Sequence, residues 1–153
     1  MKFDGCPGSR SIALDEQSEG KNDESGSRAS QLRQWPIQLF LVSPEAPYFA
    51  GADVLLTADC VAYATGDFHK DYLKDKRITI ACPKLDQSLD IYSQKITDMI
   101  DRGRINSLTV MIMEVPCCMG LYQIARQAVD KAGRKIPLNK IVIGVHGNIV
   151  EKA

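Results

Sequence analysis

The sequence predicts an α/β fold, a three-layer sandwich around a mostly parallel five-stranded sheet. Two patterns support this expectation. Short apolar runs alternate with segments of helical periodicity, and the runs are apolar at nearly every position, as in strands buried on both faces. The chain has 153 residues, 44% of them hydrophobic, which is enough for one domain with a substantial core.

Five apolar runs are predicted to form the strands. They share a length of five to seven residues and a content of Val, Ile, Leu and Met: Ile37–Val42, Ala52–Ala58, Arg77–Ala81, Ser107–Met113 and Lys140–Val145. The closing residues NIVEKA are expected to add a short hairpin strand after a turn at His146 and Gly147. The order of the strands in the sheet stays open.

Two amphipathic helices are predicted between these runs. Apolar residues recur at helical spacing from Leu85 to Ile100, and again from Leu121 to Ala132. A shorter helix is expected within Gly66–Lys74. Strands that alternate with helices indicate right-handed parallel crossovers, so we expect a Rossmann-like or flavodoxin-like sandwich.

The first thirty residues have a different composition. They are rich in Ser, Gly, Asp and Glu, and the stretch GKNDESGS has no apolar periodicity. Such a segment buries too little apolar surface to order itself alone. We therefore predict a flexible arm over residues 1–30 and an α/β domain over 31–153.

Charge and hydropathy exclude several classes of partner. Nineteen basic residues balance nineteen acidic ones, so the chain lacks the positive field that nucleic acids or anionic lipids attract. It has no apolar run of about eighteen residues and no signal-peptide core at its start. We expect a cytoplasmic protein that binds neither nucleic acid nor membrane.

The cysteines follow the predicted strands. Five cysteines in a chain without an export signal indicate thiols or metal ligands rather than a disulfide framework. Cys60 follows the second run, Cys82 the third, and Cys117 with Cys118 the fourth. The carboxyl ends of parallel strands meet at one edge of a sheet, where such folds build their sites. These four residues are our candidate metal ligands.

Thiolates at one edge suit a soft metal centre, either an iron–sulfur cluster or zinc. Cys117 and Cys118 open a predicted helix, whose positive dipole end lowers thiol pKa and favours an anionic cluster. His146 follows the fifth run, and Cys6 lies on the arm. Both are candidate cofactor-binding residues.

Alternative interpretations remain for each residue. A free cysteine is often a small buried apolar side chain, and Cys6 is equally explained as an exposed thiol. Asp59, Asp86 and Glu114 flank the cysteines and are expected to act as turn or cap groups. No G-x-G-x-x-G or Walker loop follows a strand, which argues against a nucleotide site.

Several motifs carry a resemblance to a known family. CPGS, QLRQWPIQLFLVSPEAPYF, ADVLLTADCVAYATGDFH, ACPKLD and MEVPCC, in that order, resemble small iron–sulfur proteins of anaerobic microbes labelled ferredoxin-type 4Fe-4S proteins. The resemblance covers residue 31 to the end, together with CPGS. It implies a cluster-related role. This chain has no CxxCxxC run, so it resembles the α/β portion without the ferredoxin module.

Three functions are compatible with these features. The first is electron transfer or redox sensing by a 4Fe-4S cluster, with a redox partner protein. The second is an enzyme in which three cysteines hold the cluster and one iron acts as a Lewis acid. The third is a zinc module with a structural or interaction role. A homo-oligomer is compatible with each of them.

Overall fold

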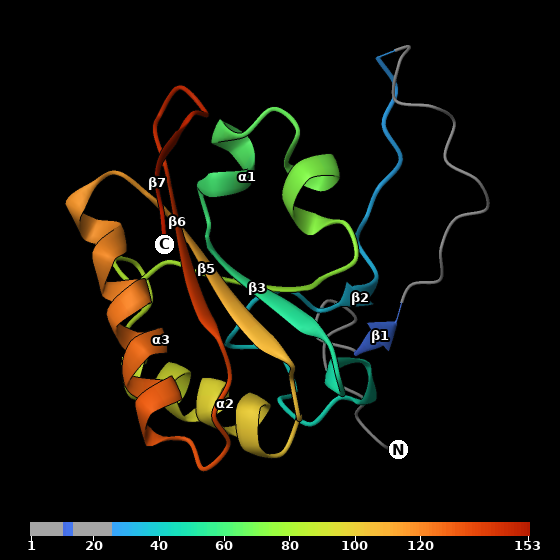
Figure 1. The fold of residues 1–153 in the computed structure, drawn as a ribbon, viewed down its shortest axis with the longest axis vertical. Coiled ribbons are helices and arrows are strands. Elements are labelled where there is room, and N and C mark those ends of the chain that lie inside the picture. Colours follow the sequence, from blue (N-terminus) through green and yellow to red (C-terminus); the bar gives the residue numbers. More distant parts are fainter. Residues whose placement is uncertain (1–10, 14–25) are drawn as a thin grey trace, which may run out of the picture.

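A computed structural model of the chain describes residues 11–13 and 26–153 (Figure 1). Its main sheet has the strand order β4-β3-β5-β6-β7. Neighbours among β4, β3, β5 and β6 pair in parallel, and β7 pairs antiparallel with β6. The strands are β3 (Asp53–Ala58), β4 (Arg77–Ala81), β5 (Ser107–Met113), β6 (Leu138–Ile143) and β7 (Ile149–Lys152). The prediction of a mostly parallel five-stranded sheet is confirmed.

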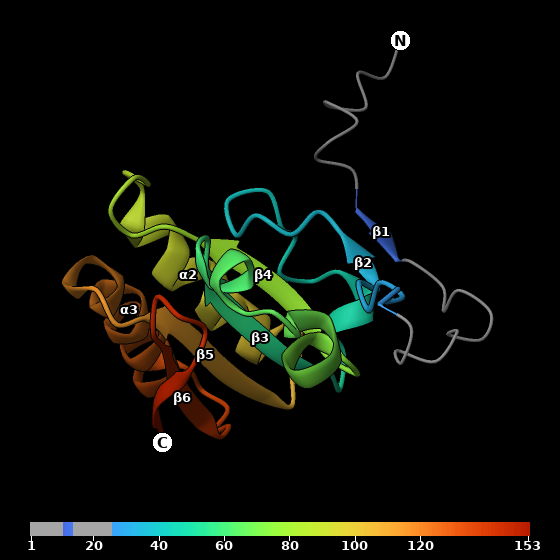
Figure 2. The same ribbon diagram turned by 90° about the horizontal axis from the view of Figure 1, so that it is seen from above.

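Both faces of the central strands are covered. β3 is buried from Val54 to Ala58, and β5 is buried at Leu108 and from Val110 to Met113. Helices α2 (Leu89–Asp101) and α3 (Met119–Lys131) pack side by side against one face (Figure 2). The connection between β3 and β4 carries α1 (Val61–Ala64) and a π-helical turn (His69–Leu73).

The strand order reverses next to β3. The chain passes from β3 to β4 on one side, and then crosses to β5 on the other side of β3 before continuing to β6. Right-handed crossovers that run in opposite directions place their helices on opposite faces. The loops after β3 and β5 therefore diverge, which makes this point the switch point of the sheet.

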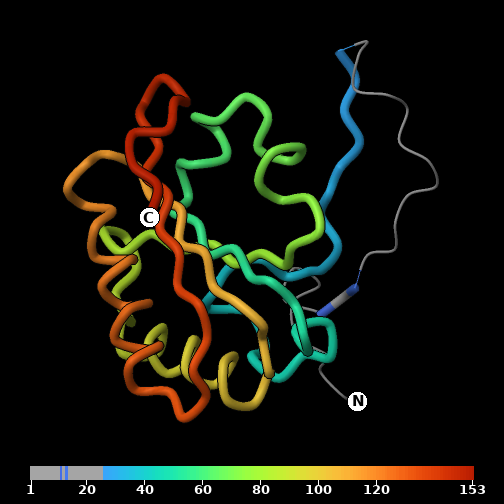
Figure 3. The backbone as a smooth tube through the Cα atoms, in the orientation of Figure 1, coloured from blue at the N-terminus to red at the C-terminus, as the bar shows by residue number. Residues whose placement is uncertain are grey.

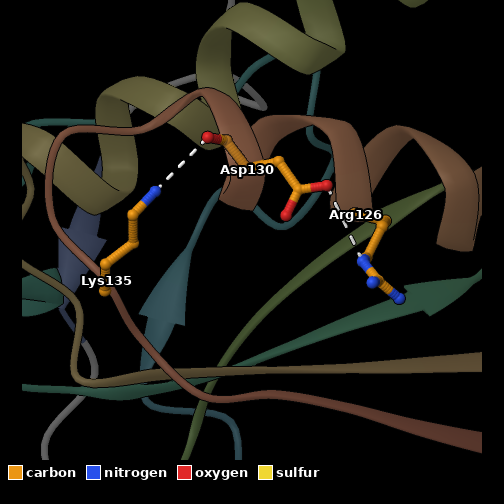
Figure 4. Close-up of polar contacts among 3 residues, drawn as sticks. All are labelled: Arg126, Asp130 and Lys135. Carbon is orange, nitrogen blue, oxygen red and sulfur yellow. Dashed lines mark hydrogen bonds and ion pairs between the residues drawn. The ribbon is translucent and has the colours of Figure 1, made fainter.

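Helix α3 confirms the second predicted helix. Its buried residues are Leu121, Ile124, Ala125 and Ala128, and Ala132 follows at the C-cap. Lys135 Nζ donates to the carbonyl oxygens of Asp130 (3.3 Å) and Ala132 (3.2 Å), as Figure 4 shows for Asp130. The Arg126–Asp130 ion pair lies one turn earlier, at 3.7 Å. The two bonds from Lys135 satisfy carbonyl groups that a helix end leaves without partners.

The predicted strand Ile37–Val42 is wrong. This segment makes only a single parallel bridge to β4, between Gln38 and Ile80, and then turns, because the N–H groups of Leu41 and Val42 both donate to Gln38 O. Lys95 Nζ on α2 holds the turn by donating to the carbonyl oxygens of residues 39, 40 and 42. The fifth strand is instead the predicted hairpin strand, β7.

The first predicted helix begins later than its periodicity indicates. α2 starts at Leu89, and Leu85 lies in the preceding turn with 76% of its surface exposed. The turn is closed by the Asp86 N–H, which donates to Cys82 O at 2.8 Å. The expected short helix within Gly66–Lys74 corresponds to the π-helical turn, which buries Leu73 next to the buried Phe68.

Part of the predicted arm lies outside the described residues. Ile12–Ala13 (β1) pairs antiparallel with Gln34–Trp35 (β2). The side chain of Gln34 is fully buried and bonds the backbone of Ile78 in both directions, with Nε2 donating to O at 2.6 Å and Oε1 accepting from N at 3.1 Å. It thus extends the hydrogen-bonding edge of β4. No helix within the described ranges is long and apolar enough to cross a bilayer.

Candidate functional site

Three adjacent strands end at the same level of the sheet. Ala58 on β3 pairs with Ala81 on β4, and Thr57 pairs with Met111 on β5. Cys82 follows β4 directly, and Cys60 follows β3 after one residue, Asp59. Cys117 and Cys118 lie in the 3-10 turn Pro116–Cys118 after β5. The four predicted metal ligands therefore share the carboxyl edge of the sheet, around its switch point.

The four thiols differ in burial. Cys60 and Cys117 are exposed, Cys82 is half-buried, and Cys118 is buried with 7% of its surface exposed. All four are free cysteines. The edge therefore carries thiols that solvent and reagents reach, together with one thiol that packs into the core.

Cys118 lies within electrostatic reach of two other thiols. Burial raises the pKa of the Cys118 thiol above its usual value, and a backbone hydrogen bond at Met113 lowers it in part. Cys117, through its charge and a hydrogen bond, and the charge of Cys60 both raise that pKa further. Three thiols from the two sides of the switch point are thus close enough to influence one another.

Cys82 belongs to a polar group beside this trio. Its N–H donates to Asp86 Oδ2 at 2.9 Å, which confirms Asp86 as a turn-closing residue. The buried Tyr92 hydroxyl on α2 bonds to Asp86. Burial, that bond, and the charges of Asp86, Asp59 and Cys82 together hold the pKa of Tyr92 well above its usual value.

Asp59 lies in the turn after β3, as expected, but one of its carboxylate oxygens has an unusual environment. Its Oδ1 is buried without a hydrogen-bond partner among the described residues. Burial raises the pKa of this carboxyl, and the neighbouring charge of Asp86 raises it further. Unpartnered polar atoms and raised carboxyl pKa values are common at functional sites.

The loops after β4 and β5 touch each other. A Cβ on Gly120, in the first turn of α3, would lie 3.6 Å from Pro83 Cβ. Pro83 directly follows Cys82, and Gly120 follows the Cys117–Cys118 pair by two residues. The contact brings Cys82 to the amino end of α3, where backbone N–H groups have no side-chain cap.

His146 lies at the border of the site rather than among the thiols. It is exposed in the turn between β6 and β7, where the Val145 N–H donates to Glu114 Oε1 at 3.3 Å. The next residue, Gly147, contacts α1, since a Cβ there would lie 2.5 Å from Ala64 O. Figure 3 shows this red hairpin beside the green α1 segment. Cys6 lies outside the described residues.

Within residues 11–13 and 26–153, no three His, Cys, Asp or Glu side chains are grouped closely enough to hold a metal ion. The thiols share an edge, but their loops are not arranged as ligands of a single ion.

Sequence reasoning missed the role of Tyr92. Its spacing predicts only a core position on the apolar face of α2, and it is indeed 2% exposed. A tyrosine on an otherwise aliphatic face is nevertheless a signal, because a buried hydroxyl needs a hydrogen-bond partner. That partner, Asp86, is part of the cysteine-bearing edge.

Comparison with known proteins gives two likenesses. Residues 46–153 match the model of a family described as a Rossmann-like domain. A protein of Archaeoglobus fulgidus, described as an uncharacterized protein, is 29% identical over 119 residues, which cover 78% of this chain and 83% of the relative. No solved structure matches the chain.

Proposed function

The chain belongs to the Rossmann-like domain family. We propose that it binds a 4Fe-4S cluster and acts in electron transfer or redox sensing. The ligands in this proposal are Cys60, Cys82, Cys117 and Cys118. One observation carries it: the four thiols follow three adjacent strands at the switch point, where this class of fold places its ligands.

The donor set supports a cluster. Four thiolates are the usual ligands of a 4Fe-4S cubane, which supplies one-electron redox chemistry when bound. Helix α3 begins at Met119, next to Cys118, and the positive end of its dipole favours negative charge there. Cys60 and Cys117 are solvent-exposed, and exposure is one of the factors that set a cluster's reduction potential.

Loop closure is part of the proposal, because among the described residues no three of the candidate side chains lie close enough together to hold one metal ion. Cys82 is already tied to Asp86 by two hydrogen bonds, so the closing segments are those of Cys60 and Cys117. A ligand that binds only the folded, closed form adds its binding free energy to the stability of the fold. Cluster loading should therefore raise the unfolding midpoint.

The likeness of CPGS, ACPKLD and MEVPCC to small iron–sulfur proteins of anaerobic microbes supports the same proposal. The labelled family also implies a redox partner protein. The zinc module and the open-site cluster enzyme are the alternatives that the test has to separate.

The test is anaerobic purification with iron and sulfide analysis. We expect brown protein with a broad sulfur-to-iron absorption band. Each single serine variant of the four ligands should lower iron per chain and leave far-ultraviolet circular dichroism unchanged. Cys6→Ser is the matched control, and full iron in that variant excludes Cys6 as a ligand.

Three outcomes would contradict or narrow the proposal. Colourless protein with stoichiometric zinc would support the zinc module instead. Full iron content in one ligand variant alone would favour the open-site cluster. If Cys117→Ser and Cys118→Ser both keep full iron while Cys118→Ser costs about 1–3 kcal/mol of stability, the pair is structural.

A further inference from the structure

A separate hollow opens beside α1, outside the group of thiols. It has a volume of about 400 Å³ and lies between α1, the π-helical turn and residues 28–30. Small-molecule sites commonly have volumes of about 300–1,000 Å³ and combine aromatic walls with a few polar groups. The hollow therefore has the size of a small-ligand site.

Aromatic rings form much of its wall. Tyr63 on α1 is 95% exposed, and such a large ring is left uncovered by the residues that the structure describes. Phe68 and His69 line the same hollow and contact each other edge to face, with ring centroids 6.1 Å apart. A flat ring placed against Tyr63 would cover apolar surface that the protein alone leaves in water.

Thr65 supplies an unused polar group. Its side chain is 7% exposed and lines the hollow, and its Oγ1 is enclosed without a hydrogen-bond partner among the described residues. An enclosed hydroxyl without a partner costs free energy. Rotation about χ1 can turn this hydroxyl toward a ligand without breaking any bond.

The remaining polar groups are fixed and balanced in charge. Arg28 Nε pairs with Asp67 Oδ1 at 2.9 Å, so a guanidinium and a carboxylate stand together on the wall. His69 Nδ1 accepts a hydrogen bond from the Gln31 N–H at 2.9 Å, which leaves Nε2 as the protonated donor of that ring. The lining thus offers donors and acceptors but no excess charge.

We propose that this hollow binds an uncharged planar heteroaromatic ring with a donor–acceptor edge, of the kind found in purines, pteridines and isoalloxazines. The ring stacks on Tyr63, and its polar edge meets Thr65, His69 and the Arg28–Asp67 pair. The thiol centre takes no part in this binding, so the proposal stands independently of a cluster.

The test is titration of the purified full chain with three probes: adenosine, lumazine and riboflavin. Fluorescence quenching follows the last two, and calorimetry follows the first. We expect at least one probe to bind with a Kd below about 1 mM. Binding by one probe and not by the others identifies the ring system, and no binding by any of them would overturn the proposal.

The sharpest variant is Thr65→Val, because it removes the hydroxyl and keeps the shape. It should weaken binding about fivefold, the effect of one hydrogen bond, and should not lower the unfolding midpoint. Thr79→Val is the matched control: Thr79 Oγ1 on β4 is equally buried and unpartnered, but Thr79 does not line the hollow. This control should keep wild-type affinity.

Two further variants test the walls. Gly66 lines the hollow, and a Cβ there meets nothing within 4 Å, so Gly66→Leu should fill the space and abolish binding in a folded protein. Tyr63→Ala should weaken binding about tenfold through lost stacking. Wild-type affinity in both Thr65→Val and Gly66→Leu would show that the probe binds elsewhere and would overturn the assignment.

Discussion

Each edge of the sheet carries an aspartate, but the two aspartates differ in hydrogen bonding and in the direction of their pKa shift. At the amino edge, Asp53 Oδ1 accepts bonds from Asn106 Nδ2 (2.8 Å) and Ser107 Oγ (2.7 Å). At the carboxyl edge, Asp59 Oδ1 is buried without a partner among the described residues. Hydrogen bonds lower the pKa of Asp53, whereas burial raises that of Asp59.

At the amino edge, hydrogen bonds also connect the end of α2 to the loop after α3. Asp101, at the end of α2, accepts bonds from the N–H groups of Gly133 (3.1 Å) and Arg134 (2.9 Å), which follow α3. The carboxyl edge has four free thiols and the enclosed hydroxyl of Thr65 instead. The amino edge thus satisfies these two carboxylates within the fold, and the carboxyl edge keeps polar groups that a ligand could satisfy.

Substitutions at two glycines should give the largest difference in stability between the two edges. Gly103, between α2 and β5, has no room for a side chain, because a Cβ would lie 2.3 Å from Pro44 O and 2.7 Å from Met99 O. Gly66, at the carboxyl edge, has open space around the same position. We expect Gly103→Ala to cost about 2–3 kcal/mol and Gly66→Ala to stay within about 0.5 kcal/mol.

Urea unfolding of the two glycine variants measures this difference. Because both changes add the same methyl group, intrinsic propensity contributes little to the comparison. Equal losses of stability in the two variants would show that the edges are equally packed, which would remove the contrast.

A smaller change in stability, one that depends on pH, is expected when Asp101 at the amino edge is replaced. Hydrogen bonds hold the pKa of Asp101 below its unfolded value of about 3.9, with the Arg134 N–H as the largest cause. The resulting stabilisation is complete above that unfolded value, and it is lost as pH falls through the lower folded pKa. We therefore expect Asp101→Asn to be less stable than wild type at pH 7 and to approach it near pH 2.

The measurement is the unfolding midpoint across this pH range, with Asp130→Asn as the control, because the exposed ion pair of Asp130 with Arg126 contributes little to stability. The control should follow the wild-type curve throughout. A deficit of Asp101→Asn that is unchanged at pH 2 would mean that the carboxylate charge is not what the two N–H groups recognise.

Removal of residues 1–28 should have the smallest effect. It deletes the two-residue β1–β2 pairing and the Arg28–Asp67 ion pair, whose side chains are 35% and 40% exposed. Partly exposed ion pairs contribute less than about 1 kcal/mol. We expect cooperative unfolding with a nearly unchanged midpoint, as the predicted flexible arm requires. Loss of cooperativity in thermal unfolding would place this segment in the core.

Patterns of consecutive residues predicted most of the elements. The apolar face from Leu121 to Ala132 defined α3 because a helix repeats its contacts every three to four residues. The runs ADVLLTA, RITIA and SLTVMIM were also correct, since strands buried on both faces are apolar at each position.

The errors fall where other hydrogen bonds, distant or local, override the apolar pattern. Ile37–Val42 is as apolar as the true strands, but it turns at Gln38, and its carbonyl groups bond to Lys95 on α2. Leu85 fits the helical period of α2, but the Cys82–Asp86 turn delays the helix. The Lys95 contacts have no local signal, because Lys95 lies more than fifty residues from its partners, whereas the Cys82–Asp86 turn is a local contact that outweighs the helical period at Leu85.

The α/β class, the main elements of the sheet and the placement of cysteines after three strands could be predicted from the sequence, because each depends on residues near one another in the chain. The tertiary structure places β3 between β4 and β5, which makes those three strand ends adjacent. It also decided that Thr65 is enclosed and that Tyr63 remains exposed. Pairing and burial join residues that are far apart in sequence, so they are decided only when the whole sheet has formed.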